Sequence, residues 1–113
     1  MVREQDSAEA LRTGEVPVLA SPRLVALCEE AACAALAGRL GPGMTTVGSS
    51  VQFNHLAPTA IGGRVTAEAT LEKVEGRRLC FTVAANDERG LVGAGRMTRV
   101  VVETERFLKR AHE

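Results

Sequence analysis

The pattern of hydrophobic and polar residues changes its period once, near residue 45. Before this point, residues 21–38 (SPRLVALCEEAACAALAG) are apolar or small on nearly every side of a helix, which predicts one buried helix. After it, apolar and polar residues alternate with a period of two, which predicts β-strands. The chain is therefore expected to consist mainly of one long helix followed by a sheet.

Both ends of the helix carry typical boundary residues. Ser21 is a favoured N-cap, and Pro22 is favoured at the first helical position. Gly38 marks the end of the helix, and the glycine-rich run 41–48 (GPGMTTVG) follows it. This run lacks the lysine of a phosphate-binding loop, and no helix comes after it. We therefore interpret it as a helix stop and a turn into the first strand.

Four strands are expected after the helix. Their approximate ranges are 45–55, 64–74, 79–85 and 91–102. In the first strand, simple alternation places Val47 on the same face as His55 and Gly48 on the opposite face. The connections predict an antiparallel meander in which each strand pairs with its neighbour in sequence.

The remaining parts of the chain are short. Residues 1–5 predict a weak first strand, and the charged tail after about residue 103 is either a short helix or frayed. The fold class is therefore α+β, with a curled antiparallel sheet packed on a central helix. A chain of 113 residues is long enough for one core, so we expect a single domain over 1–113 with the tail beginning near residue 104.

Composition excludes several classes of protein. Basic and acidic residues number 14 each, and aromatic residues make up 3% of the chain, which argues against nucleic-acid binding. The start of the chain lacks the pattern of a secretory signal, and no apolar run is long enough to span a membrane. We therefore expect a cytoplasmic protein with no nucleic-acid or membrane partner.

The cysteines and histidines do not form a metal-binding pattern. Cys28, Cys33 and Cys80 make no C-x-x-C pair, and there are only two histidines. We expect three reduced, buried thiols that act as small hydrophobic residues. Neither a metal nor a separate cofactor is expected.

Few polar residues could do chemistry inside this fold. They are Ser21, the adjacent carboxylates Glu29 and Glu30, and His55. Each also has a purely structural interpretation: a helix cap, a solvated patch and a hydrogen-bonded core histidine. Eight residues separate Ser21 from Glu29, which is about 80° around the helix and about 12 Å along it, so these two can flank one groove. His55 lies on the strand face expected to cover the helix, where it could pair with a carboxylate.

Most of the chain, about residues 15–107, resembles the fluoroacetyl-CoA thioesterase-like family of hotdog-fold proteins. The similar runs include VPVLASPRLVALCEEAA and GPGMTTVGSSVQFNHLAP. The family has a hydroxyl residue before its central helix, a glutamate eight residues later and a histidine 26 residues after that. Ser21, Glu29 and His55 match these positions, and Gly48 matches a family glycine. The resemblance therefore selects Glu29 over Glu30.

The resemblance implies an acyl-CoA thioesterase acting on a small or medium acyl group, with CoA present only as part of the substrate. Glu29 would attack the thioester or activate water, His55 would assist the leaving thiolate or orient the water, and Ser21 would supply a hydrogen bond. The backbone of Gly48 would approach the acyl group. The resemblance also implies a homodimer with its site between the helix of one subunit and the sheet edge of the other. Assembly into a tetramer stays open.

Two departures from the family limit what carries over. The hydroxyl is that of Ser21 where the naming enzyme has threonine, and residues 12–20 (RTGEVPVLA) lack the phenylalanines of that enzyme's lid. Fluoroacetyl selectivity is therefore not expected. The main alternative is a non-catalytic acyl-CoA-binding or ligand-sensing protein on the same fold. A hydratase is disfavoured because no closely spaced Asp and His pair is present.

Overall fold

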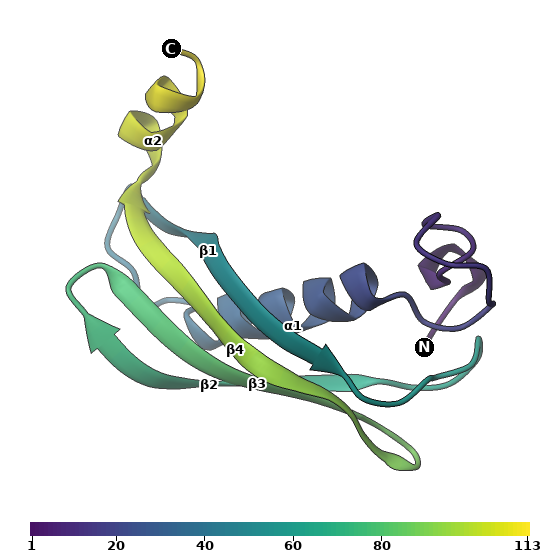
Figure 1. The fold of residues 1–113 in the computed structure, drawn as a ribbon. Coiled ribbons are helices and arrows are strands. Elements are labelled where there is room, and N and C mark those ends of the chain that lie inside the picture. The colour runs from purple at the N-terminus through teal and green to yellow at the C-terminus, as the bar shows by residue number, and fades with distance from the viewer.

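A four-stranded antiparallel sheet bends around one long helix in the computed structural model, which describes residues 1–113 (Figure 1). The elements in chain order are η1 (Glu4–Asp6), α1 (Ser21–Ala35), β1 (Met44–His55), β2 (Thr66–Glu75), β3 (Arg78–Asp87), β4 (Gly90–Glu103) and α2 (Thr104–Ala111). The predicted α+β class and the curled sheet on a central helix are confirmed. The charged tail forms the short helix α2, which extends beyond one end of the sheet (Figure 1).

The strand order is β1-β4-β3-β2, so the predicted meander is wrong for the first strand. Strand β1 pairs with β4 along nearly its whole length, and the chain then crosses to the opposite edge to form β2. The connection over residues 56–65 contains Pro58 and is longer than the two to five residues of an ordinary hairpin loop. Only the last three strands are joined by tight turns and pair in sequence order.

Strand β1 contains a bulge that changes which residues face α1. Its register against β4 shifts between Gly48 and Ser50, so Ser49 is an extra residue. Because side chains alternate along a strand, one extra residue moves those before it to the other face. Gly48 therefore shares the helix-facing side with His55, and the predicted placement of Val47 on that side is wrong.

The core lies between α1 and the helix-facing side of the sheet. The predicted inward residues of β3 are all buried: Leu79, Phe81, Val83 and Ala85. They pack with helix residues at four-residue spacing: Leu24, Cys28 and Ala32. Leu71 of β2 is 41% exposed, at a position where the β2–β3 register shifts.

The helix and the cysteines differ in part from expectation. Helix α1 ends at Ala35 rather than Gly38, and Gly38 lies in the following turn with a φ of +73°. All three thiols are free, and burial raises the pKa of Cys28. Cys33 is exposed and Cys80 is half-buried, so full burial was predicted correctly only for Cys28.

The start of the chain forms a 3-10 helix rather than the predicted strand. The Asp6 carboxylate accepts a hydrogen bond from the backbone N–H of Arg3 at 2.9 Å, which stabilises this tight turn. The following residue, Ser7, forms an isolated antiparallel bridge with Leu19. The N-terminal segment thus lies against the residues that lead into α1 (Figure 1). Neither α1 nor α2 combines the length and the apolar character that crossing a lipid bilayer requires.

Candidate active site

Ser21 and His55 meet where the start of α1 passes the end of β1. Ser21 Oγ and His55 Nδ1 are 2.7 Å apart, within hydrogen-bonding distance. The N-cap residue of α1 is Ala20, and Ser21 is already helical and makes no capping bond. The prediction that Ser21 caps the helix is therefore wrong. Its hydroxyl bonds the imidazole instead, and we name these two residues the serine–histidine pair.

The second ring nitrogen of His55 has no partner. His55 Nε2 is buried, and no group of the chain forms a hydrogen bond with it. Buried polar atoms in proteins are nearly always hydrogen-bonded, because leaving one unsatisfied costs about 1–3 kcal/mol. An imidazole with one nitrogen held and the other open can exchange a proton or a hydrogen bond with a bound molecule.

Glu29 contacts a buried arginine that sequence reasoning did not identify. Glu29 Oε2 lies 3.3 Å from Nη1 of Arg99, a residue of β4 that is 7% exposed. Thr46 of β1 completes the contacts of Arg99: its hydroxyl accepts from Nε and its carbonyl from Nη2, both at 3.0 Å. We name these three residues the glutamate–arginine cluster. The guanidinium is thus bonded on both of its edges and holds the carboxylate in one place.

A signal for Arg99 was present in the sequence. It alternates with Met97 and Val101, two apolar residues that belong to the core side of β4. A charged residue at a core-facing position needs a partner, because burying an unpaired charge is costly. That partner is the carboxylate of Glu29, across the groove between α1 and the sheet.

Gly48 leaves room for this carboxylate. A Cβ atom built on Gly48 would lie 3.1 Å from Glu29 Oε2 and 3.7 Å from Arg99 Nη1. Any side chain here would press against the carboxylate, so glycine permits the close approach. The bulge at Ser49 creates this arrangement, because it turns position 48 toward the helix.

The structure brings the four predicted residues together in two groups rather than one. His55 meets Ser21, and Glu29 meets Gly48, but no hydrogen bond joins Glu29 to Ser21 or His55. The expected direct pairing of the carboxylate with the imidazole is therefore not formed within this chain.

Glu30, in contrast, has a side chain 67% exposed and contacts only Arg23 at 3.6 Å. Glu30 is thus the solvent-facing member of the two adjacent carboxylates.

A pocket of about 330 Å³ lies beside the serine–histidine pair. Both members of the pair line it, together with Ala8, Thr13 and Val18 of the N-terminal segment. These residues are small or medium in size, and no phenylalanine is among the lining residues. The structure also gathers no group of three or more His, Cys, Asp or Glu side chains that could hold a metal ion.

The family model for fluoroacetyl-CoA-specific thioesterases matches residues 2–105. This chain belongs to that family. It is 39% identical over 90 residues to the fluoroacetyl-CoA thioesterase of Streptantibioticus cattleyicolor, and the matched region covers 80% of this chain. The match spans 65% of that relative, a little under two thirds of its length.

Solved structures agree with this assignment. The fluoroacetyl-CoA thioesterase FlK superposes with a TM-score of 0.92 at 33% identity, over 98% of this chain and 87% of that chain. A thioesterase superfamily member from Thermus thermophilus gives 0.89 at 32% identity, over 99% and 85%. A hot-dog-like protein from Thermanaerovibrio acidaminovorans gives 0.89 at 28% identity, over 97% and 82%. The predicted family and the hotdog fold are confirmed.

Proposed function

We propose that this protein hydrolyses acyl-CoA thioesters to the free acid and CoA. The observation that carries the proposal is that two polar groups, the serine–histidine pair and the glutamate–arginine cluster, lie along the same helix with their side chains held in place. A glutamate is held by a buried arginine against a glycine backbone, and a histidine is held by a serine with its other nitrogen open. Family membership and the match to a fluoroacetyl-CoA thioesterase support the same chemistry.

Glu29 acts on the thioester carbonyl in this proposal. Its carboxylate either attacks the carbonyl carbon directly or accepts a proton from the water that attacks it. Arg99 fixes the carboxylate in one orientation, which reduces the reorganisation needed when the substrate binds. The side chain of Glu29 is 40% exposed, so a bound thioester can reach its carboxylate.

His55 assists the departure of CoA. The open Nε2 protonates the leaving thiolate or orients the attacking water, while Ser21 keeps the ring in place through Nδ1. To protonate the thiolate, Nε2 must carry a proton, and in the neutral ring Nδ1 then accepts from the Ser21 hydroxyl. In the other tautomer, Nδ1 donates to Ser21 and the lone pair of Nε2 can orient the attacking water.

We further infer that the working unit is a homodimer. Strand β1 lies at the edge of the sheet and pairs on one side only, with β4. Such an edge offers a row of free backbone donors and acceptors to another strand. On the helix-facing side of this strand, Val51 is 44% exposed, which leaves apolar surface for a second copy to cover. Pairing of two copies here would place the helix of one subunit beside the sheet edge of the other.

The acyl group is expected to be small or medium in size. The pocket beside Ser21 is about 330 Å³, and its N-terminal wall is built from Ala8, Thr13 and Val18. Because the wall lacks aromatic side chains, we do not propose selectivity for a fluoroacetyl group. The relative from Streptantibioticus cattleyicolor is named for fluoroacetyl-CoA, and this chain is 39% identical to it over 90 residues.

A panel of acyl-CoAs tests the proposal. Purified protein is mixed with acetyl-, longer-chain and aryl-CoAs, release of free thiol is followed, and thermal stabilisation is measured in parallel. Thiol release with small or medium acyl groups supports hydrolysis. Stabilisation by acyl-CoA without any thiol release would instead identify a binding protein, the main alternative.

A further inference from the structure

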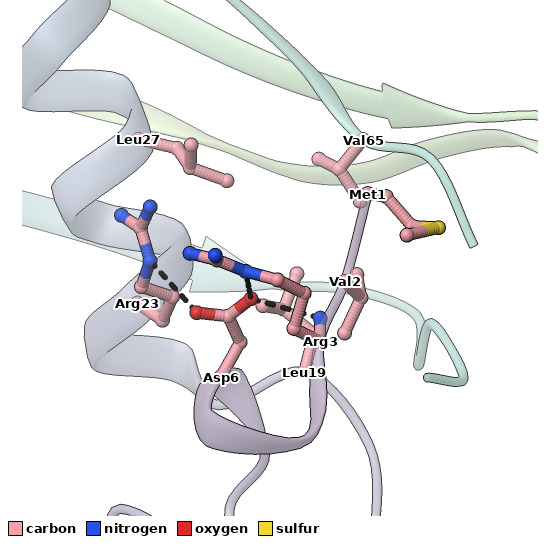
Figure 2. A pocket seen from close by; sticks show the side chains of 8 residues that line it. All are labelled: Met1, Val2, Arg3, Asp6, Leu19, Arg23, Leu27 and Val65. Carbon is pink, nitrogen blue, oxygen red and sulfur yellow. Dashed lines mark hydrogen bonds and ion pairs between the residues drawn. The ribbon is translucent and has the colours of Figure 1, made fainter. Parts of the chain in front are cut away.

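Asp6 is a buried carboxylate at the start of the chain, outside the two groups described above. It is 7% exposed and lies beside a pocket of about 310 Å³ between the N-terminal segment, α1 and the start of β2. Figure 2 shows Arg3 and Arg23 approaching its carboxylate from the N-terminal segment and from α1. Arg23 Nε donates to Asp6 Oδ1 at 3.1 Å, and the backbone N–H of Arg3 donates to Oδ2 at 2.9 Å.

The backbone of Asp6 makes a second connection to the same helix end. Its carbonyl oxygen accepts a hydrogen bond at 2.9 Å from the N–H of Ala20, the N-cap residue of α1. Ala20 immediately precedes Ser21, and Arg23 follows Ser21 by two residues. Asp6 therefore bonds to the helix start on both sides of Ser21, once through its backbone and once through its side chain.

No side chain caps the start of α1. Its N-cap residue is alanine, which offers no side-chain acceptor, and the hydroxyl of Ser21 is committed to His55. A carboxylate near the first turn of a helix is favourable, because the helix dipole is positive there. The hydrogen bond from Arg3 and the contact with Arg23 both lower the pKa of Asp6, so this anchor is charged at neutral pH.

We propose that Asp6 is a positioning residue that holds the first turn of α1 so that Ser21 bonds His55 in the reactive orientation. Asp6 does not touch the substrate in this proposal, and its effect reaches the reaction only through Ser21. The inference rests on the proposed thioesterase function for its kinetic consequence, but its geometric part is independent of activity.

The test uses three variants of the full-length protein. Asp6→Asn removes the charge at nearly constant size, and Arg23→Gln removes the link to the helix while leaving the bonds from Arg3 and Ala20 in place. Glu4→Gln is the matched control, because Glu4 is an exposed acid in the same 3-10 helix with no side-chain partner. Circular dichroism establishes that each variant is folded.

Two readouts are measured on these variants. Steady-state kinetics on the best acyl-CoA separates kcat from KM. Nitrogen-15 NMR reports the imidazole of His55, which is easily assigned because His112 is the only other histidine and can be removed. A Ser21→Ala variant supplies the reference signal for a His55 ring that has lost its serine.

The expected result is a fall of several-fold in kcat for Asp6→Asn and Arg23→Gln, no larger than the loss of about tenfold expected for Ser21→Ala, with KM unchanged, because a displaced catalytic group slows chemistry more than binding. The His55 signals of both variants should move toward those of Ser21→Ala, while Glu4→Gln should match the wild type.

Wild-type His55 signals in a folded Asp6→Asn or Arg23→Gln protein would overturn the proposal. If Asp6→Asn does not fold, the kcat and the His55 signals of Arg23→Gln alone decide whether the proposal holds. A wild-type protein without thiol release would refute the proposed function, and NMR would still judge the role of Asp6.

Discussion

Helix α1 holds two polar groups of different character, about two turns apart on one side. The serine–histidine pair is a contact between a hydroxyl and an imidazole at 2.7 Å, and the second ring nitrogen is buried without a partner. The glutamate–arginine cluster is a charged contact at 3.3 Å, and its guanidinium is bonded on both edges. One group is incomplete and the other is closely held. The difference indicates that His55 Nε2 can take a hydrogen-bond partner from another molecule, whereas Arg99 holds the Glu29 carboxylate in one place.

Removing the carboxylate should have the largest effect. In Glu29→Gln the amide can neither attack a thioester nor accept a proton from water, so we expect kcat to fall by about a thousandfold. The rate of thiol release from an acyl-CoA measures this fall in kcat. Glu30→Gln is the matched control, since this exposed neighbour should keep near-native activity. Near-native turnover in a folded Glu29→Gln protein would remove Glu29 from the mechanism.

Loss of the buried arginine should be the next largest effect. Arg99→Gln leaves Glu29 in place but frees its carboxylate to rotate, and we expect about a hundredfold loss of kcat. Thr46→Val removes one of the two acceptors that hold Arg99, so its loss should be smaller. An Arg99→Gln protein as active as the wild type would show that the cluster needs no fixed orientation.

The hydroxyl of Ser21 should matter less than either charged group. Ser21→Ala removes one hydrogen bond to His55, and we expect about a tenfold fall in kcat, which corresponds to about 1.4 kcal/mol. If the two groups act independently, the effects of Ser21→Ala and Arg99→Gln should multiply in the double variant. Strong non-additivity would indicate that the pair and the cluster work as one unit, for example across a subunit boundary.

A methyl group at Gly48 should produce a still smaller change. In Gly48→Ala the new Cβ lies 3.1 Å from Glu29 Oε2, so the carboxylate must shift by a few tenths of an ångström. We expect about a threefold fall in kcat, with the unfolding temperature nearly unchanged. Gly41→Ala is the control, because its Cβ would meet only Met44 at an ordinary 3.8 Å. Unchanged kinetics in Gly48→Ala would mean that the carboxylate moves freely.

The serine end of α1 should also be sensitive to acid through its anchor. Asp6 has a pKa lowered from its ordinary value of 3.8 by the backbone N–H of Arg3 and by Arg23, itself beside Glu30. Its stabilising contribution is therefore fully present above that value and is lost as pH falls through the lower folded pKa. Denaturant unfolding of wild type and Asp6→Asn should differ at pH 7 and converge in acid. A difference that does not shrink as the pH falls below 3.8 would contradict this origin.

Local sequence pattern predicted much of the fold and most of the candidate site. Periodicity predicted the helix from Ser21 and the alternation of β3. The choice of Glu29 over Glu30 came only from the family resemblance. The pattern missed Arg99, although a charge between Met97 and Val101 pointed to it. The pattern also predicted that Ser21 caps the helix, because a serine before a helix usually does so. In the structure the N-cap is Ala20, and the Ser21 hydroxyl bonds His55 instead.

The sequence by itself determined the elements, because helix and strand periods are set by residues a few positions apart. Only the tertiary structure decided which strands are neighbours and which side chains meet. The pairing of β1 with β4 and the bulge at Ser49 depend on residues about 50 positions apart, and no local period encodes them. That bulge turns Gly48 toward Glu29, and that pairing brings Arg99 to the same carboxylate. The sequence supplied the candidate site residues, and long-range strand pairing arranged them.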